Sequence, residues 1–309
     1  MRIGGVLNLL GKLLLILSMM LLTPLPFSLY YHDGMVNDFV ICSGLGLVTG
    51  GLLTVLFLPE EELGYKDGFA IVTFSWLSLG LLGALPYYFS GYIPGFVDAF
   101  FESVSGFTTT GSTILADIEV LPRSLLFWRA LTQWLGGMGI IVLTLAILPL
   151  LGIGGMQLFQ AEVPGPTKDR LAPRVQDTAR ILWSVYLVMT AAETMLLMLG
   201  GVDFFNALTH SFTTLATGGF SNFNASIAQY PSPYIQSVFI LFMFLAGVSF
   251  SLHFLALRQQ NPLSYWRNEE FRFYLSLILL AVILVFIANT AADSTNNAGR
   301  GLLDGAFQV

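Results

Sequence analysis

A short phrase rich in threonine and glycine occurs twice in this chain, each time between long apolar runs. The first copy runs from Phe101 to Ser112 and the second from Thr209 to Phe220, at an offset of 108 residues. A helix needs about 20 residues to cross a bilayer, so each segment is too short to cross but long enough to enter halfway and return. Irregular backbone at membrane depth is stable only where it is buried in protein or lines a water-filled path. The repeat therefore predicts two re-entrant segments.

The composition excludes an ordinary soluble protein. The chain is 55% hydrophobic and 10% charged, whereas typical globular domains are about 25% charged. The net charge of -6 comes without a basic patch, so no nucleic-acid partner is expected. The single cysteine, Cys42, lies in an apolar run, which excludes a disulfide framework and a CxxC metal site. These features predict a polytopic helical protein surrounded by membrane lipid.

Seven apolar runs are long enough to cross a membrane. They cover residues 5–29, 37–58, 69–89, 125–151, 178–200, 234–257 and 272–292. With the N-terminus in the cytoplasm, Lys and Arg residues are distributed ten inside to three outside, which is the positive-inside bias. Both Thr/Gly segments then lie between an outward and an inward span, so both enter the membrane from outside.

The runs group into repeated units. Residues 1–62 form an N-terminal transmembrane hairpin, and residues 63–160 form a first pore repeat of span, half-helix, Thr/Gly strand and span. Residues 161–262 are a cytoplasmic loop and a second such repeat, and residues 263–309 begin a third repeat that stops before its filter. The predicted fold class is an all-α polytopic membrane protein built from repeated span–re-entrant pore helix–filter strand–span units, with the third repeat incomplete.

The residue types in the Thr/Gly tracts suit the binding of a desolvated cation. Backbone carbonyls and threonine hydroxyls supply oxygen ligands without burying a full charge. Gly111, Gly218 and Gly219 can adopt backbone angles that other residues resist, which allows successive carbonyls to face one axis. The alternative is that the tracts are close interhelical packing or extramembrane turns. Two copies with matching flanks favour the filter interpretation.

Each tract follows a predicted half-helix, at residues 96–107 and 204–215. The C-terminal end of such a helix carries a partial negative charge, which favours a cation close to it. Asp98 is expected to act as an N-cap carboxylate at the outer end of the first half-helix.

The motifs of this chain resemble those of the bacterial Trk-type potassium uptake proteins, the TrkH-like membrane subunits of the Trk/Ktr/HKT potassium transporter superfamily. The resemblance covers essentially the whole chain and rests on the two Thr/Gly phrases and on residues 127–140, 148–157 and 161–166. It implies four potassium-channel-like repeats around a pseudo-fourfold pore, preceded by an extra N-terminal hairpin. The third and fourth filter strands would lie beyond Val309, so we expect this chain to be part of a longer protein.

The resemblance also assigns the residues of a K⁺-binding filter. They are Thr108, Thr109, Thr110, Gly111 and Ser112 in the first strand, and Ala216, Thr217, Gly218, Gly219 and Phe220 in the second. Potassium at these residues is the only metal implied. K⁺ is the transported ion, and neither an organic cofactor nor a catalytic residue is expected.

The function implied by the resemblance is potassium uptake across the bacterial inner membrane, by a homodimer that is gated with a cytoplasmic nucleotide-binding regulatory ring (TrkA-like). The alternative within the superfamily is a Na⁺-permeable or cation-coupled symporter. Glycine at positions 111 and 219 matches the K⁺-selective type, so Gly→Ser at either position is expected to relax selectivity. An intramembrane enzyme is not expected, because no Ser/His, paired Asp or HExxH arrangement lies at membrane depth. A non-conducting scaffold is the third alternative.

Four polar residues within apolar segments need separate interpretations. Glu102 is expected either to bind nearby backbone or to attract ions, and Arg129 to be a snorkelling anchor at the outer interface rather than to tune the filter. Glu193 is a functional candidate as an intramembrane carboxylate, unless it lies at the outer interface. His210 is expected to be a buried histidine with its hydrogen bonds satisfied.

Overall fold

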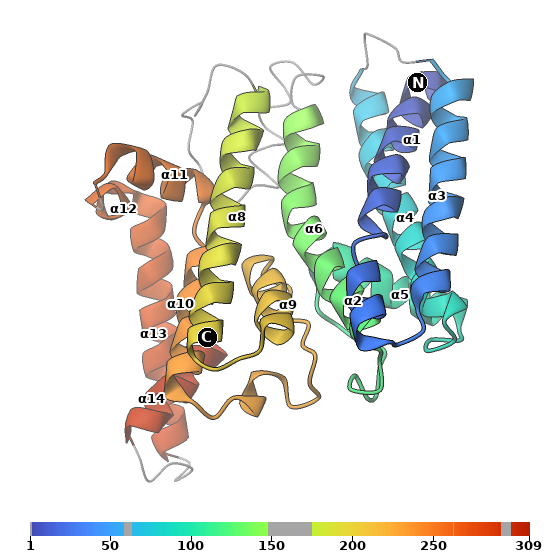
Figure 1. Ribbon diagram of the computed structural model, residues 1–309. Coiled ribbons are helices and arrows are strands. Elements are labelled where there is room, and N and C mark those ends of the chain that lie inside the picture. The colour runs from blue at the N-terminus through green and yellow to red at the C-terminus, as the bar shows by residue number, and fades with distance from the viewer. Residues whose placement is uncertain (1, 59–63, 148–174, 262, 292–297) are drawn as a thin grey trace. The chain divides into compact units, whose positions relative to one another are not determined.

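The computed structural model describes residues 2–58, 64–147, 175–261, 263–291 and 298–309 (Figure 1). Throughout these residues the regular secondary structure is helical, without a β-strand. The helices form two compact units: the first is Met1–Val163 with Gly218–Ser226, and the second is Pro164–Thr217 with Ile227–Val309. The predicted domain boundaries after residues 62, 160 and 262 involve residues outside the described ranges, so the domain organisation stays a prediction.

The first unit begins with the expected N-terminal hairpin. It comprises α1 (Ile3–Met20), α2 (Leu25–Tyr31) and α3 (Val36–Leu56), and α1 packs along both α3 and α4 (Tyr65–Phe89) (Figure 1). Two glycines allow α1 and α3 to approach closely, since a Cβ atom on Gly11 would lie 2.8 Å from the Gly50 carbonyl oxygen. The Ser43 hydroxyl donates a hydrogen bond to the Ser18 carbonyl at 2.8 Å across the same interface.

The first predicted half-helix is confirmed as α5 (Phe96–Phe107), which packs between α4 and α6 (Arg123–Ile147). The buried Trp128 of α6 anchors this packing: its indole N–H donates to the Gly83 carbonyl at 3.0 Å, and its ring meets the edge of Phe107. Gly95 is the N-cap of α5 and Asp98 lies in the first turn, so the N-cap assignment of Asp98 was wrong. Its charge still lies at the positive end of the helix dipole.

The second unit repeats this arrangement. The second predicted half-helix is confirmed as α9 (Phe204–Leu215), which packs against α8 (Val175–Leu199) and α10 (Pro233–Ala246). Asp203 caps α9 by accepting hydrogen bonds from the Asn206 backbone N–H at 3.1 Å and side-chain amide at 2.6 Å. The remaining helices of this region are η2 (Ser226–Gln229), α11 (Phe250–Gln259), α12 (Leu263–Arg267), α13 (Glu269–Ala291) and α14 (Ala298–Gln308).

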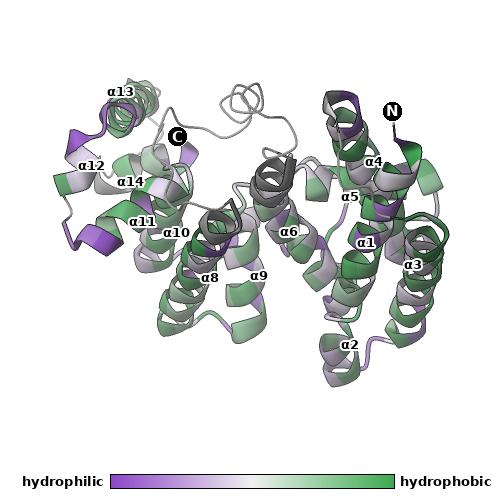
Figure 2. Ribbon diagram, turned by 90° about the horizontal axis from the view of Figure 1, so that it is seen from above, coloured by the Kyte–Doolittle hydropathy of each residue, from purple (hydrophilic) through white to green (hydrophobic). Residues whose placement is uncertain are grey.

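Five stretches of the described chain are long and apolar enough to cross a membrane, in line with a polytopic fold (Figure 2). They are Ile3–Tyr31, Val36–Leu56, Lys66–Phe89, Arg180–Leu199 and Glu269–Ala288. The span predicted at 125–151 corresponds to α6, which is not among these five, and its last residues lie outside the described ranges.

The span predicted at 234–257 is not continuous, because α10 and α11 are bent by 97° at the intervening residues. Two carbonyls at the end of α10 accept hydrogen bonds from side chains, and the Leu245 carbonyl also accepts from the Val248 N–H at 3.1 Å. His253 Nε2 donates to the Leu245 carbonyl at 2.8 Å, and the Tyr274 hydroxyl donates to the Phe244 carbonyl at 3.3 Å. Gly247 at the bend has no room for a side chain, since a Cβ atom would collide with the Tyr274 hydroxyl.

Asp33, in the loop between α2 and α3, ties this loop to the beginning of α6. Its carboxylate accepts hydrogen bonds from the Ser28 hydroxyl at 2.5 Å, and from the backbone N–H and hydroxyl of Ser124 at 3.0 and 2.7 Å. Partial burial raises the pKa of Asp33, but the hydrogen bonds from Ser28, Ser124 and the Met35 N–H outweigh it, so the net pKa is lowered.

A lowered pKa in the folded state means that Asp33 stabilises the fold above its unfolded-state pKa of about 3.9, and that this stability is lost as the pH falls through the folded pKa. We expect Asp33→Asn to lower the free energy of unfolding by about 1 kcal/mol at pH 7, a value discounted for the solvent exposure of the carboxylate. Denaturant titrations at pH 7 and pH 3 test this. The difference between the two proteins should shrink at pH 3, and an unchanged difference would contradict the role of the ionised carboxylate.

Candidate functional site

The two Thr/Gly strands share one backbone conformation. In the first strand Thr109 has φ 54° and Gly111 has φ 77°. In the second strand the aligned residues Thr217 and Gly219 have φ 53° and 77°. In an extended strand successive carbonyls point to opposite sides. Left-handed residues at every second position rotate the peptide planes, so the carbonyls no longer alternate in this way. The sequence repeat therefore extends to the local geometry that sets carbonyl direction.

Thr109 ends α5 in a Schellman motif. Its N–H bonds to the Gly106 carbonyl and the N–H of Thr110 bonds to the Ser105 carbonyl, both at 3.0 Å. A β-branched residue at positive φ is uncommon and costs about 1–3 kcal/mol. The same outlier at Thr109 and Thr217 indicates that the surrounding contacts impose this conformation on both strands.

The first unit brings together the first strand and the end of the second. A Cβ atom on Gly111 would collide with the Gly218 carbonyl oxygen, so the two strands touch at this point. Gly218, Gly219 and Phe220 belong to the first unit, whereas Ala216 and Thr217 continue α9 in the second.

The carbonyl oxygens of these strands differ in whether the protein already uses them. Within the described part of the chain, no hydrogen bond reaches the carbonyls of residues 108–111 or of Gly219. The Ser112 carbonyl accepts from the Ser105 hydroxyl at 2.5 Å, and the Gly218 carbonyl accepts from the Gln133 side-chain amide at 2.8 Å. The Ala216 carbonyl accepts from the Thr217 hydroxyl at 2.7 Å. The oxygens without a partner can therefore accept a cation, while those of Ser112 and Gly218 hold the strands in place.

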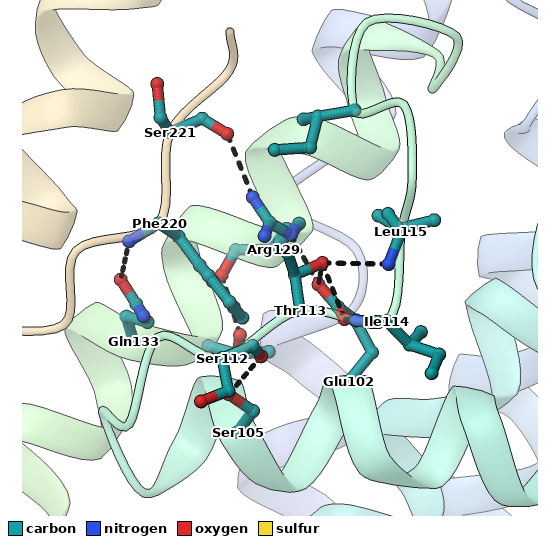
Figure 3. A network of polar contacts seen from close by, with 12 residues as sticks. Glu102, Ser105, Ser112, Thr113, Ile114, Leu115, Arg129, Gln133, Phe220 and Ser221 are labelled. Atoms are coloured by element: carbon teal, nitrogen blue, oxygen red, sulfur yellow. Dashed lines mark hydrogen bonds and ion pairs between the residues drawn. The ribbon is translucent and has the colours of Figure 1, made fainter. Parts of the chain in front are cut away.

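A buried ion pair lies behind the first strand (Figure 3). Arg129 Nε donates to Glu102 Oε1 at 2.6 Å, and the side chains are 2% and 0% exposed. Glu102 also accepts from the Thr113 hydroxyl at 2.9 Å and from the Ile114 backbone N–H at 3.0 Å. The expected hydrogen bonding of Glu102 to nearby backbone is confirmed. The snorkelling interpretation of Arg129 was wrong, because its guanidinium points into the protein toward Glu102.

Arg129 also holds the second strand (Figure 3). Its Nη1 donates to the Ser221 carbonyl at 2.9 Å, and its guanidinium carbon lies 3.6 Å from the centre of the Phe220 ring. One buried side chain on α6 therefore contacts α5, through Glu102, and the end of the second strand. Since Glu102 is neutralised by this pair, a cation binding at the strands would rely on backbone oxygens.

The loops that follow the two strands are clasped by Asn224. Its side-chain oxygen accepts from the Ile118 N–H at 2.8 Å, its side-chain amide donates to Asp117 at 2.7 Å, and its backbone N–H donates to Glu119 at 3.0 Å. Asp117 and Glu119, which follow the first strand and are exposed, therefore help to hold in place the loop after the second strand.

Two residues singled out from the sequence lie in the second unit. His210 is buried in α9 with Nδ1 on the Asn206 carbonyl at 2.8 Å, which confirms a buried histidine with a hydrogen-bond partner. Glu193 is fully buried in α8, and its carboxylate oxygens have no hydrogen-bond partner in the described structure. Burial places the Glu193 carboxylate inside the protein, and its depth in the membrane stays a prediction.

Sequence reasoning missed Gln133 and Asn224. A signal for Gln133 was present: it lies four residues after Arg129 within an apolar run, which puts both polar side chains on one helix face. Asn224 lies in a loop after the second strand, and nothing in its spacing from residues 117–119 predicts their contact.

Comparisons with known proteins agree with this architecture. The sequence profile of a family described as TrkH, cation transport protein, matches residues 36–298. The Trk system potassium uptake protein TrkH of Halomonas elongata is 41% identical over 315 residues, covering 100% of this chain and 64% of that protein. The protein of the same name from Escherichia coli K12 is 41% identical over 302 residues, covering 95% and 62%.

The solved structures include a close match as well. The crystal structure of the potassium transporter TrkH from Vibrio parahaemolyticus matches with a TM-score of 0.88 and 35% identity, covering 100% of this chain and 64% of that one. The chain thus spans less than two thirds of the length of these relatives. From the profile match and these relatives, the chain belongs to the TrkH family of cation transport proteins.

Proposed function

We propose that this chain supplies two strands of a potassium-selective filter in a membrane cation pathway. The observation that carries the proposal is the shared geometry of the strands, with positive φ at Thr109 and Gly111 and again at Thr217 and Gly219. Chance would not place left-handed residues at the same two positions of both copies. The strands are Thr108–Ser112 and Ala216–Phe220, and their exposed carbonyl and hydroxyl oxygens replace the hydration shell of the ion.

The electrostatics around the first strand support a cation ligand set made of backbone. The α5 helix ends at Phe107, directly before the strand, so the negative end of its dipole lies beside the free carbonyls. The nearby Glu102 is paired with Arg129 and does not offer a free carboxylate. Neutral oxygens bind a monovalent cation while allowing it to leave, which conduction requires.

The names of the relatives extend the proposal to the whole system. Proteins described as Trk system potassium uptake proteins are transport proteins, so we assign K⁺ as the transported ion, with no organic cofactor in this chain. We assign it to the bacterial inner membrane with its N-terminus in the cytoplasm, as a homodimer that works with a TrkA-like nucleotide-binding regulatory ring. The positive-inside distribution of Lys and Arg supports the orientation.

Uptake of Rb⁺, as a K⁺ surrogate, and of Na⁺ into proteoliposomes tests the proposal. Because the chain covers 64% of the Halomonas elongata relative, the assay uses this chain by itself and a chimera in which that relative supplies the remaining C-terminal part. We expect Rb⁺-selective uptake by the chimera, assayed with the regulatory subunit of the relative. The unaltered relative is the positive control.

Two results would overturn the proposal. Comparable Rb⁺ and Na⁺ uptake by a folded chimera would favour the Na⁺-permeable alternative, and uptake that requires a Na⁺ or proton gradient would favour a cation-coupled symporter. A monodisperse chimera without any cation uptake, alongside an active relative, would identify these strands as a non-conducting scaffold.

A further inference from the structure

The side chain of Gln133 contacts the second strand at two backbone groups. Its Nε2 donates to the Gly218 carbonyl at 2.8 Å. Its Oε1 accepts from the Phe220 N–H at 3.1 Å, as Figure 3 shows. Gln133 is 0% exposed. A side-chain amide carries both a donor and an acceptor, so it can pair with a carbonyl and the N–H two residues later as a neighbouring strand would. The second strand is irregular and has no neighbouring β-strand in the described structure, so this amide takes that place.

Gly218 makes this approach possible. It is not among the residues with positive φ, so its backbone conformation does not itself require glycine. A Cβ atom at this position would, however, collide with the Cδ, Oε1 and Nε2 atoms of Gln133. The sequence-based reason for this glycine, unusual backbone angles, therefore applies to Gly111 and Gly219 but not to Gly218.

The direction of the Gly218 carbonyl follows from the same contact. Its oxygen accepts from Gln133 and touches Gly111, and the residue is buried. The next residue, Gly219, is exposed, and no hydrogen bond reaches its carbonyl within the described chain. Because Gln133 and Gly111 occupy the surroundings of the buried Gly218 oxygen, an ion on the exposed side of the strand would meet the Gly219 carbonyl instead.

We propose that Gln133 is a positioning residue that sets the register of the second filter strand, and that the Gly218 carbonyl is its anchor rather than an ion ligand. This inference rests on the proposed function for its effect on selectivity. The clamp itself, between α6 and residues 218–220, is independent of what the pathway conducts. The two parts can therefore be tested separately.

Amide hydrogen exchange on the 309-residue chain tests the clamp without any transport assay. Gln133→Met keeps the size of the side chain but removes both hydrogen bonds. We expect exchange at the Phe220 N–H to accelerate by about tenfold or more, since this group loses its acceptor. The matched control is Gln236→Met, which removes a side-chain hydrogen bond to the Tyr230 carbonyl of 3.1 Å outside the strand. Unchanged exchange at Phe220 would overturn the clamp.

A double-mutant cycle in the chimera tests the role of Gly218. We expect Gln133→Ala and Gly218→Ala each to lower the ratio of Rb⁺ to Na⁺ uptake by about tenfold, and the double variant to match Gln133→Ala within about twofold. Once the side chain of Gln133 is short, a methyl group at 218 has room. An additive loss in the double variant would instead assign the glycine a direct role at the ion.

Failure of this inference is distinguishable from failure of the proposed function. If the unsubstituted chimera is not Rb⁺-selective, the proposed function fails, while the exchange experiment still decides on the clamp. If the chimera is selective and Gln133→Ala keeps its ratio, the positioning role fails alone. Size-exclusion chromatography of every variant identifies misfolded protein, for which Gln133→Ser, another short side chain, replaces Gln133→Ala in the cycle.

Discussion

Replacing Arg129 by methionine is expected to lower the free energy of unfolding by about 3–5 kcal/mol, the range for a buried charge that loses its partner. The substitution leaves the Glu102 carboxylate, which is 0% exposed, without its counter-ion. Hydrogen bonds from Thr113 and Ile114 remain, but they do not neutralise the charge. The Ser221 carbonyl also loses its donor, so the effect should reach the second strand.

The double variant Arg129→Met with Glu102→Gln distinguishes the contribution of the ion pair to stability from the cost of leaving one buried charge without its partner. Because both charges are then absent, we expect it to be more stable than either single variant. The control is Arg272→Met, whose partner Glu269 is exposed and 3.8 Å away, and which should change stability by less than about 1 kcal/mol. Unfolding in mixed micelles, followed by tryptophan fluorescence, compares these four variants with the unsubstituted chain. A loss for Arg129→Met no larger than that of the control would contradict the buried pair.

The half-helices were the most predictable elements of the fold. Both were predicted with the bounds that α5 and α9 have, because an amphipathic stretch of limited length between two apolar runs has few alternatives. The Thr/Gly tract that follows each one cannot continue a helix easily. Five of the seven predicted spans also correspond to apolar helices long enough to cross a membrane.

The bend between α10 and α11 was not predictable from hydropathy. Residues 234–257 form one apolar run. Glycine is frequent in membrane helices, so Gly247 by itself does not predict a break. At the break, Tyr274 and His253 donate to carbonyls at the end of α10, and these contacts form only in the folded chain. Hydropathy measures composition and carries no information about such partners.

The backbone conformation of two glycines in the candidate site was predictable, but the contacts that support the strands were not. Gly111 and Gly219 have the positive φ that their position suggested. Thr109 and Thr217 share that conformation against the preference of a β-branched residue, which shows that tertiary contacts override local preference at this point. Arg129 was assigned to the interface because single residues were weighed without their partners. Its partner Glu102 is 27 residues away, on another helix.

Gly219→Ser is expected to lower the ratio of Rb⁺ to Na⁺ uptake by about tenfold or more while leaving the chimera folded, since the left-handed conformation costs a non-glycine residue only about 1–2 kcal/mol. Gly219 has φ 77° and no atom within 4 Å of an added Cβ, so the new side chain fits. The strain is relieved by rotating the peptide, which redirects a carbonyl that we assign to the ion. Radiotracer uptake of both ions gives the ratio.

Gly111→Ser should act differently although φ is also 77°, because its Cβ atom would collide with the Gly218 carbonyl oxygen. Backbone cannot move aside as a side-chain end does, so we expect loss of uptake together with about 1–3 kcal/mol of lost stability from overpacking. Gly91→Ser is the control, with φ 76° and open space in the loop between α4 and α5. It carries the same conformational cost away from the strands. If Gly91→Ser shifted the uptake ratio as much as Gly219→Ser, strain at any glycine would explain the loss, and carbonyl direction at the filter would not.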